Sequence, residues 1–372
     1  MRVGLLTTLN TNIGDDFIRE GICLVLREVF RGHEVEFVPV NKHQPSTVYT
    51  GLHLIHLGRI TRYLPRWRYR VTGLVERTAK RPKLSRFDSC DLIVQCGTPV
   101  LWRHCHLCEW ADLIWHQVIG RLSQSIPVLN LAAGSCYPWE RQPERIEDED
   151  DAQYLRDIFS YCRVTTVRDT LAQSLCASLG LDTPLIPCSA FLAYRNHTNE
   201  KNDGSFVFIN YMSGGGHYDL DQKIDPSRWA KTVSELITRL KSRHRLAFLC
   251  HNEVEFKLAH DLAPTFPRLW PKNTYEYLEL LGKAKVALCN RMHASMVLAS
   301  SGIPSVAVCT DTRLLMVDAI ELPCFYVKEA NTDKLEDSLE DLILHRAQER
   351  ERLLALRLET WRKYIEVTAG AI

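Results

Sequence analysis

Residues 286–308, VALCNRMHASMVLASSGIPSVAV, constrain the fold of this chain more than any other stretch. An apolar run is followed by a polar turn, by a second apolar segment that stops at Gly302, and by another apolar run. Short runs of this kind are typical of strands buried on both faces of a parallel sheet. Because parallel strands are joined by a crossover that is usually a helix, the stretch predicts a strand–helix–strand unit.

The polar turn of this unit contains Asn290, Arg291 and His293. It precedes the predicted helix, whose first amides lack partners inside the helix and carry the positive end of its dipole. A guanidinium and an imidazole beside such amides favour an anion site, and an imidazole also transfers protons near neutral pH. We therefore expect Arg291 and His293 to be catalytic and Asn290 to bind substrate. The alternative is structural: Arg291 pairs with a nearby acid, and His293 caps the helix.

The same alternation of short apolar runs and helical periodicity occurs along both halves of the chain, which predicts an α/β protein with parallel sheets. The polar segment 194–205 is the best linker. It separates an N-terminal Rossmann-like domain, residues 1–195, from a C-terminal one, residues 205–345, and the two sheets are expected to face each other across a cleft. We expect a final helix, residues 346–372, to pack back on the N-terminal domain.

Further candidate residues follow other predicted strands. They are Asn12, Asp15 and Asp16 after residues 2–8, Arg168 after residues 163–167, Gly214 and Gly215 after residues 206–210, and His251 after residues 246–250. Ligands in open α/β sheets bind outside the carboxyl ends of the strands, so these residues are expected to bind substrate. Asp15 is in addition a candidate catalytic base, and consecutive glycines allow the backbone to approach a phosphate. The alternatives are helix capping by the acids and a local ion pair for Arg168.

The composition excludes some classes of protein. Lys plus Arg number 46 and Asp plus Glu 45, so nothing indicates binding to nucleic acid. The 13 cysteines are scattered, and several fall within apolar runs, which favours a reducing compartment over a disulfide framework. No apolar run approaches the length of a membrane span. We expect a cytoplasmic protein.

Residues 50–86 differ from the rest of the chain, because ten Lys or Arg residues stand against a single acid, with aromatic residues between them. One interpretation is a peripheral contact with an anionic membrane surface, or a clamp for an acceptor linked to a lipid diphosphate. The other is a solvated insertion that packs on the N-terminal domain. Both stay open.

Cys105 and Cys108 form a CxxC pair flanked by His104 and His106. A structural zinc site usually takes four ligands from two such clusters, and the chain has no second CxxC. Residues that pack or line the cleft are therefore the preferred interpretation. We predict no metal.

Three motifs together resemble the polysaccharide pyruvyl transferase family. They are Asn12-Ile-Gly-Asp15, then Val167-Arg168-Asp169 with Leu179-Gly180, and then Asn290-Arg-Met-His-Ala294 with Gly302-Ile-Pro304, in the order and spacing of that family. Two features depart from its pattern: Cys96-Gly-Thr-Pro99 replaces a run of glycines, and Pro187-Cys-Ser189 replaces an Asp-Pro before the linker. Both departures lie in the half expected to face the acceptor.

The resemblance implies a GT-B-like fold and transfer of a pyruvyl group from phosphoenolpyruvate to hydroxyls of a saccharide, often as a ketal, in polysaccharide biosynthesis at the cell envelope. Phosphoenolpyruvate is then a donor substrate, no cofactor is needed, and the acceptor is a saccharide or a lipid-linked saccharide. The family's donor-binding roles carry over to Arg168, Arg291 and His293. Two rival functions remain: a nucleotide-sugar-dependent glycosyltransferase of the same fold, for which Glu253 or Glu255 would bind the ribose, and a non-catalytic binding module.

Overall fold

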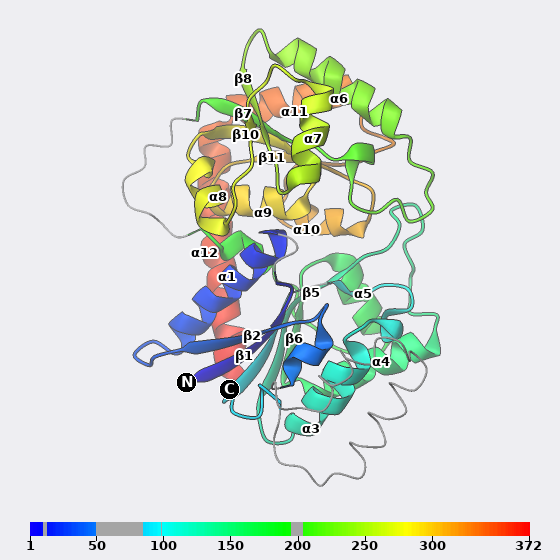
Figure 1. The fold of residues 1–372 in the computed structure, drawn as a ribbon, viewed down its shortest axis with the longest axis vertical. Coiled ribbons are helices and arrows are strands. Elements are labelled where there is room, and N and C mark those ends of the chain that lie inside the picture. The colour runs from blue at the N-terminus through cyan, green and yellow to red at the C-terminus, as the bar shows by residue number, and fades with distance from the viewer. Residues whose placement is uncertain (10–12, 50–84, 98, 195–203) are drawn as a thin grey trace, which may run out of the picture.

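Two sheets of six strands each form the framework of a computed structural model that describes residues 1–9, 13–49, 85–97, 99–194 and 204–372. Every strand pairing within the two sheets is parallel. Figure 1 shows the two sheets one above the other, with helices around and between them. Asn12 and nearly all of the basic segment 50–86 fall outside the described residues, so the predictions made for them stay predictions.

The N-terminal sheet has the order β2-β1-β3-β5-β4, and β6 pairs with β5. Its strands are β1 (Arg2–Thr7), β2 (Glu36–Asn41), β3 (Leu92–Cys96), β4 (Pro99–Leu101), β5 (Val128–Ser135) and β6 (Val164–Val167). Its helices are α1 (Ile13–Val29), α3 (Gly120–Leu122), α4 (Glu149–Tyr161) and α5 (Thr170–Ser178), with a π-helix at Ala111–Ile119 before α3. All eight residues of β5 are buried, as expected of a central parallel strand.

The C-terminal sheet has the order β12-β11-β10-β7-β8-β9. Its strands are β7 (Phe206–Asn210), β8 (Arg245–Leu249), β9 (Arg268–Leu269), β10 (Ala284–Cys289), β11 (Ser305–Cys309) and β12 (Cys324–Tyr326). Its helices are α6 (Pro226–Leu240), α7 (Glu253–Leu262), α8 (Thr274–Leu281), α9 (Met292–Ser300), α10 (Leu315–Asp318) and α11 (Thr332–Leu344). The strand–helix–strand unit predicted from residues 286–308 is confirmed as β10, α9 and β11.

Helix α9 is buried almost all round, which explains why its sequence has no polar face. Eight of its nine residues are buried, and α1 and the short 3₁₀ turn Ser189–Leu192 pack against it. This layer of apolar residues is continuous from the N-terminal sheet to the C-terminal sheet. The two halves of the chain therefore share one core rather than meeting only at a polar surface.

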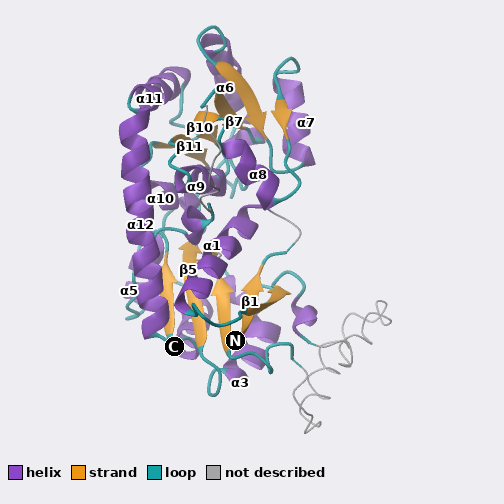
Figure 2. Cartoon of the chain, turned by 90° about the vertical axis from the view of Figure 1, so that its left-hand side faces the viewer, coloured by secondary structure: helices purple, strands orange, loops and turns teal. Residues whose placement is uncertain are grey.

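The last helix, α12 (Arg346–Gly370), runs along one side of both sheets (Figure 2). It returns to the N-terminal half, where Tyr364 Oη donates a hydrogen bond to the carbonyl of Pro187 at 3.0 Å. Near the end of the chain, Arg163 Nη1 donates to the carbonyl of Ile372 at 3.2 Å. None of the described helices is long and apolar enough to cross a membrane.

Candidate active site at the facing strand ends

A cavity of about 480 Å³ lies where the carboxyl ends of the two sheets face each other. Its lining residues come from the segments that follow nine strands. They are Thr8, Asp15, Lys42, His43, Trp102, Trp110, Cys136, Arg168, His217, Tyr218, Leu220, Asn252, Arg291, His293 and Arg313. Three arginines, a lysine and three histidines thus surround a single carboxylate, and such a lining attracts anions.

Arg168 is the most deeply buried of these cations. It follows β6, its backbone amide donates to the carbonyl of Ala133 at 2.9 Å, and its side chain is fully buried. Nη1 donates to His293 Nε2 and to Cys188 Sγ, each at 3.5 Å. Nε and Nη2 have no partner among the described residues. Buried donors without partners cost free energy, so this guanidinium is an energetically costly part of the cavity wall.

Gly134 makes the position of Arg168 possible. A Cβ atom at Gly134 would lie 2.4 Å from Arg168 Nε, closer than any real contact. Gly134 belongs to β5, the strand beside β6, so the guanidinium crosses directly over the neighbouring backbone. No larger residue fits beneath it.

Arg291 is oriented by a buried acid. Its Nε donates to Glu255 Oε1 at 2.7 Å, and its backbone amide donates to Asn210 Oδ1 at 2.8 Å. Glu255 is only 2% exposed and also accepts from Asn210 Nδ2 at 2.9 Å and from the His251 amide at 2.8 Å. No hydrogen bond within the described part of the chain uses Nη1 or Nη2 of Arg291. These two nitrogens are the donors that it can offer to a ligand.

His293 lies in the first turn of α9, half-buried against α1. A Cβ at Gly14 would lie 2.7 Å from its Nδ1, which shows how closely the two helices approach. Burial, followed by the positive charge of Arg168, holds the pKa of His293 well below its ordinary value. The imidazole is therefore neutral at neutral pH, and a bound anion would raise its pKa again.

Two cavity cations were not among the predicted site residues. Arg313 lies after β11, forms a two-point ion pair with Asp311 at 2.8 and 2.6 Å, and places its guanidinium 4.7 Å from the Tyr218 ring centroid. Lys42 follows β2, and its Nζ lies 4.8 Å from the Trp110 ring centroid. The sequence contained a signal for both residues, because each is a cation just beyond a predicted buried strand.

The two predicted acids, Asp15 and Asp16, differ in their position relative to the cavity. Asp15 lies in the first turn of α1 and is the only carboxylate among the described residues that line the cavity. Asp16 forms an ion pair with Arg19 at 2.6 Å and does not line the cavity. Burial raises the pKa of Asp16. Only Asp15 is therefore placed to meet a ligand.

Besides Asp16, four predicted binding residues are not among those lining the cavity: Asn290, His251, Gly214 and Gly215. The side chain of Asn290 is used internally, since Oδ1 accepts from the Met212 amide at 2.9 Å and Nδ2 donates to the Val308 carbonyl at 3.0 Å. These contacts join the ends of neighbouring strands, so the Asn290 side chain is engaged inside the fold. Its role in substrate binding stays a prediction.

His251 is buried, with Nε2 3.0 Å from Tyr277 Oη, and burial together with the charge of Arg291 lowers its pKa to about 4. Gly214 and Gly215 have φ angles of 71° and 78°, which glycine adopts without strain. The loop they form continues to His217 and Tyr218, which do line the cavity. The glycines thus shape the loop that carries these two lining residues, and their own role in substrate binding stays a prediction.

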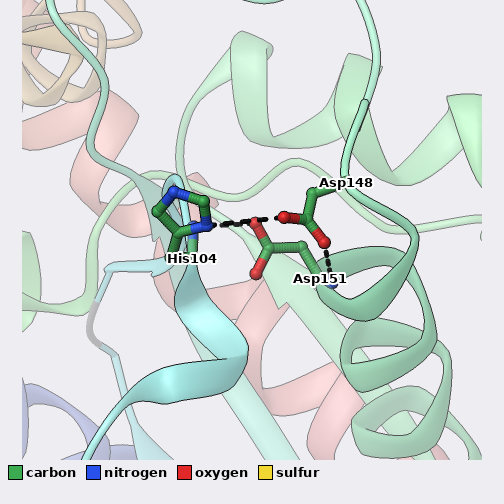
Figure 3. A group of neighbouring side chains, drawn as sticks. All are labelled: His104, Asp148 and Asp151. Atoms are coloured by element: carbon green, nitrogen blue, oxygen red, sulfur yellow. Dashed lines mark hydrogen bonds and ion pairs between the residues drawn. The ribbon is translucent and has the colours of Figure 1, made fainter.

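The segment around Cys105 is joined to α4 by a carboxylate. His104 Nδ1 lies 3.4 Å from Asp148 Oδ2 (Figure 3), and the possible ligand atoms of His104, Asp148 and Asp151 lie within 4.8 Å of one another. Asp151, however, accepts from the amides of His104 at 2.8 Å and His106 at 3.1 Å, so both of its oxygens are already engaged. Burial also raises the pKa of the Cys105 thiol. The geometry is that of a turn held by a buried carboxylate.

Hydrogen bonds join the two halves beside the cavity, next to its lining residues Cys136 and Arg313. Ser135 Oγ and Thr312 Oγ1 are 2.9 Å apart, and the Tyr137 amide donates to the same Thr312 oxygen at 2.9 Å. Further out, Lys328 Nζ pairs with Glu140 at 2.8 Å. These contacts hold Arg168 of one half opposite Arg291 and Arg313 of the other.

Comparison with solved structures finds proteins of similar fold. UDP-GlcNAc 2-epimerase from Neisseria meningitidis bound to UDP-GlcNAc matches with a TM-score of 0.53 and 11% identity, over 95% of this chain and 94% of that one. MnaA of S. aureus in complex with UDP matches with a TM-score of 0.53 and 11% identity, over 95% and 91%. At such identity the similarity concerns the fold alone. The predicted GT-B-like α/β fold is confirmed.

A comparison with curated protein sequences finds no match. Among models of protein families, the one described as polysaccharide pyruvyl transferase matches residues 12–311. That range covers most of both sheets and contains Arg168, Arg291 and His293. The chain belongs to the polysaccharide pyruvyl transferase family.

Proposed function

We propose that this chain transfers the pyruvyl group of phosphoenolpyruvate to hydroxyls of a saccharide and releases phosphate. The observation that carries the proposal is the buried guanidinium of Arg168, with two unpartnered nitrogens, beside His293 Nε2 in a cation-lined cavity. A small ligand with two anionic groups fits this lining better than a neutral one. Phosphoenolpyruvate carries a carboxylate and a phosphate close together.

The cations are distributed so that each anionic group finds a donor. Arg168 approaches from the N-terminal sheet, and Arg291 and Arg313 approach from the C-terminal sheet. Guanidinium groups bind carboxylate and phosphate in two-point contacts, which fix the orientation of the donor. A cavity of about 480 Å³ lies within the usual range for small-molecule sites and leaves room for an acceptor.

The chemistry begins at the enol carbon. The imidazolium of His293 protonates C3 of phosphoenolpyruvate, which makes C2 electrophilic, and an acceptor hydroxyl attacks C2. Phosphate then leaves with the C2–O bond electrons, and a second hydroxyl closes the ketal. Of the two protons released by the hydroxyls, one restores the imidazolium and the other leaves on the phosphate.

Anion binding supplies the protonated state that this step needs. Arg168 and burial disfavour the imidazolium, and the negative charge of a bound phosphate offsets both effects. Proton uptake by His293 is thus coupled to donor binding. A positioned proton donor of this kind contributes a rate factor of roughly 10²–10⁴.

The rival nucleotide-sugar transferase is less well supported. Its ribose would need a free carboxylate in the C-terminal half. Glu255 is 2% exposed and paired with Arg291, whereas Glu253 pairs with Lys257 at 2.7 Å and does not line the cavity. The family leads us to propose a saccharide acceptor. A lipid link on that saccharide, and a membrane contact through residues 50–86, stay predictions.

The test is phosphate release from phosphoenolpyruvate in the presence of a panel of saccharides, with His293→Ala and Arg291→Ala as loss variants. Both variants should remain folded and lose turnover. In parallel, thermal shifts with phosphoenolpyruvate, UDP-, GDP- and CMP-sugars compare the two donor classes. Stabilisation by a nucleotide sugar but not by phosphoenolpyruvate would contradict the proposal, and stabilisation by none of them would favour a non-catalytic module.

A further inference from the structure

Lys42 is a buried lysine on the N-terminal wall of the cavity, and the donor-binding arrangement described above does not use it. It is 6% exposed and follows β2, where its backbone amide donates to the Thr7 carbonyl at 2.9 Å. Its Nζ lies 4.8 Å from the centroid of the Trp110 ring. The aromatic face holds the end of the side chain by a cation–π contact and covers it from solvent.

Charged groups approach Lys42 from several elements. Asp15 of α1 favours its ammonium form, Arg168 disfavours it, and Cys108 and Glu109 contribute from the segment before the π-helix. Glu109 also pairs with His43 at 3.3 Å. Burial raises the pKa of the Cys108 thiol, so that group is neutral near pH 7. The remaining charges are therefore two acids, Asp15 and Glu109, which favour the ammonium form, and the guanidinium of Arg168, which disfavours it.

Together these influences shift the protonation equilibrium of Lys42 towards the neutral amine. Burial is the largest effect and Arg168 adds to it, so the pKa of Lys42 falls to about 8, although Asp15 acts against both. A general base is most effective when its pKa is close to the working pH. Lys42 meets that condition and lines the same cavity as His293.

Resting on the proposed function, we propose that Lys42 is the base that takes the proton from the acceptor hydroxyl, with Asp15 as the counter-ion of the ammonium that forms. The sequence pattern had pointed to Asp15 for this role. Lys42 and Asp15 follow β2 and β1, which are neighbouring strands, whereas His293 reaches the cavity from the other sheet. The acid and the base of the addition thus belong to opposite walls.

The step balances as follows. The hydroxyl O–H bond breaks and its proton forms an N–H bond on Lys42, while the oxygen forms a bond to C2 of phosphoenolpyruvate. The C2=C3 pair of electrons takes a proton from the imidazolium of His293 at C3. When the bond between C2 and the phosphate oxygen breaks, the departing phosphate takes the proton from the Lys42 ammonium. The second hydroxyl supplies the proton that restores the imidazolium.

The test compares Lys42→Arg, Lys42→Met and Lys42→Ala with a matched control, Lys231→Arg, whose side chain is 79% exposed. Arginine keeps the charge but does not lose its proton, so it separates electrostatic binding from proton transfer. We expect both Lys42→Arg and Lys42→Met to lose roughly 10²-fold or more in phosphate release with an acceptor from the panel. Thermal stabilisation by phosphoenolpyruvate should persist in Lys42→Arg, and the control should match the wild type.

Two further readouts distinguish a base from a structural residue. The rate of the wild type should rise with pH along a limb near pH 8, and this limb should vanish in Lys42→Arg. Ethylamine added to Lys42→Ala should restore turnover in proportion to its free-base concentration. Near-wild-type turnover in Lys42→Arg, or no rescue in a folded Lys42→Ala, would overturn the inference. Absence of phosphate release from the wild type would instead overturn the proposed function.

Discussion

Replacing Arg168 by methionine should make the protein more stable while abolishing donor binding. Two of its guanidinium nitrogens are buried without a partner among the described residues, and its remaining contacts, to Cys188 and His293, are long at 3.5 Å. A buried donor left unpaired costs about 1–3 kcal/mol. Both nitrogens are removed in the variant, so we expect a net gain in stability of about 1–3 kcal/mol.

Arg313→Met is the matched comparison and should have the opposite effect. Arg313 also lines the cavity, but it pairs with Asp311, whose side chain is 0% exposed. Removing this partner leaves a buried carboxylate without its counter-charge, which costs about 3–5 kcal/mol. The two substitutions are thus predicted to change stability in opposite directions, because Arg313 forms an ion pair with a buried acid and Arg168 forms none among the described residues.

Urea unfolding followed by circular dichroism measures both effects. The midpoint of the transition is compared between wild type and variant, provided that the two have the same m-value. Phosphoenolpyruvate should raise the midpoint of the wild type and leave that of Arg168→Met unchanged, because only a ligand that binds the native state stabilises it. The reasoning fails if Arg168→Met is less stable than the wild type, or if Arg313→Met is as stable as the wild type.

Three further substitutions test other parts of the site. Gly134→Ala should displace Arg168, and the loss of a charge-assisted contact of about 1.5–3 kcal/mol should raise the KM for phosphoenolpyruvate by roughly 10-fold or more. Gly370→Ala is the control and should have no effect, because a Cβ at Gly370 has no atom within 4 Å. Glu255→Gln weakens the contact that orients Arg291, so kcat should fall by roughly 10–100-fold. The far-UV circular dichroism spectrum should be unchanged. The pKa of His251 is about 4 in the folded protein, below its value in the unfolded chain. The unfolded state therefore binds more protons, and the protein loses stability as the pH falls from about 6.5 towards 4. His251→Gln should flatten this acid limb by up to about 1.4 kcal/mol per pH unit, and an unchanged limb would show that His251 titrates normally.

Much of the framework could be predicted from local sequence. Short apolar runs with helical segments between them indicated the two parallel sheets, and the stretch containing Arg291 and His293 was correctly placed between two buried strands. The pattern also placed Arg168 at a strand end. These predictions succeed because strand burial and helix periodicity are set by neighbouring residues.

The local sequence did not predict which of the side chains at the strand ends line the cavity. Asn290 and His251 stand at strand ends, as predicted, yet their side chains bond to Val308 and Tyr277 inside the fold. Lys42 stands at an equivalent strand end and lines the cavity. Position at a strand end therefore does not decide the direction of the side chain.

By itself the sequence determined the alternation of strands and helices, and with it the edge of each sheet at which polar residues collect. Only the tertiary structure decided which residues from the two edges meet: Arg168 beside His293, Glu255 beneath Arg291, and Lys42 against Trp110. Each of these contacts joins segments distant in the chain, and α9, α1 and the turn Ser189–Leu192 bring those segments together by packing. Side-chain direction and burial, and with them the pKa of His293 and Lys42, follow from that packing rather than from the neighbouring residues in the chain.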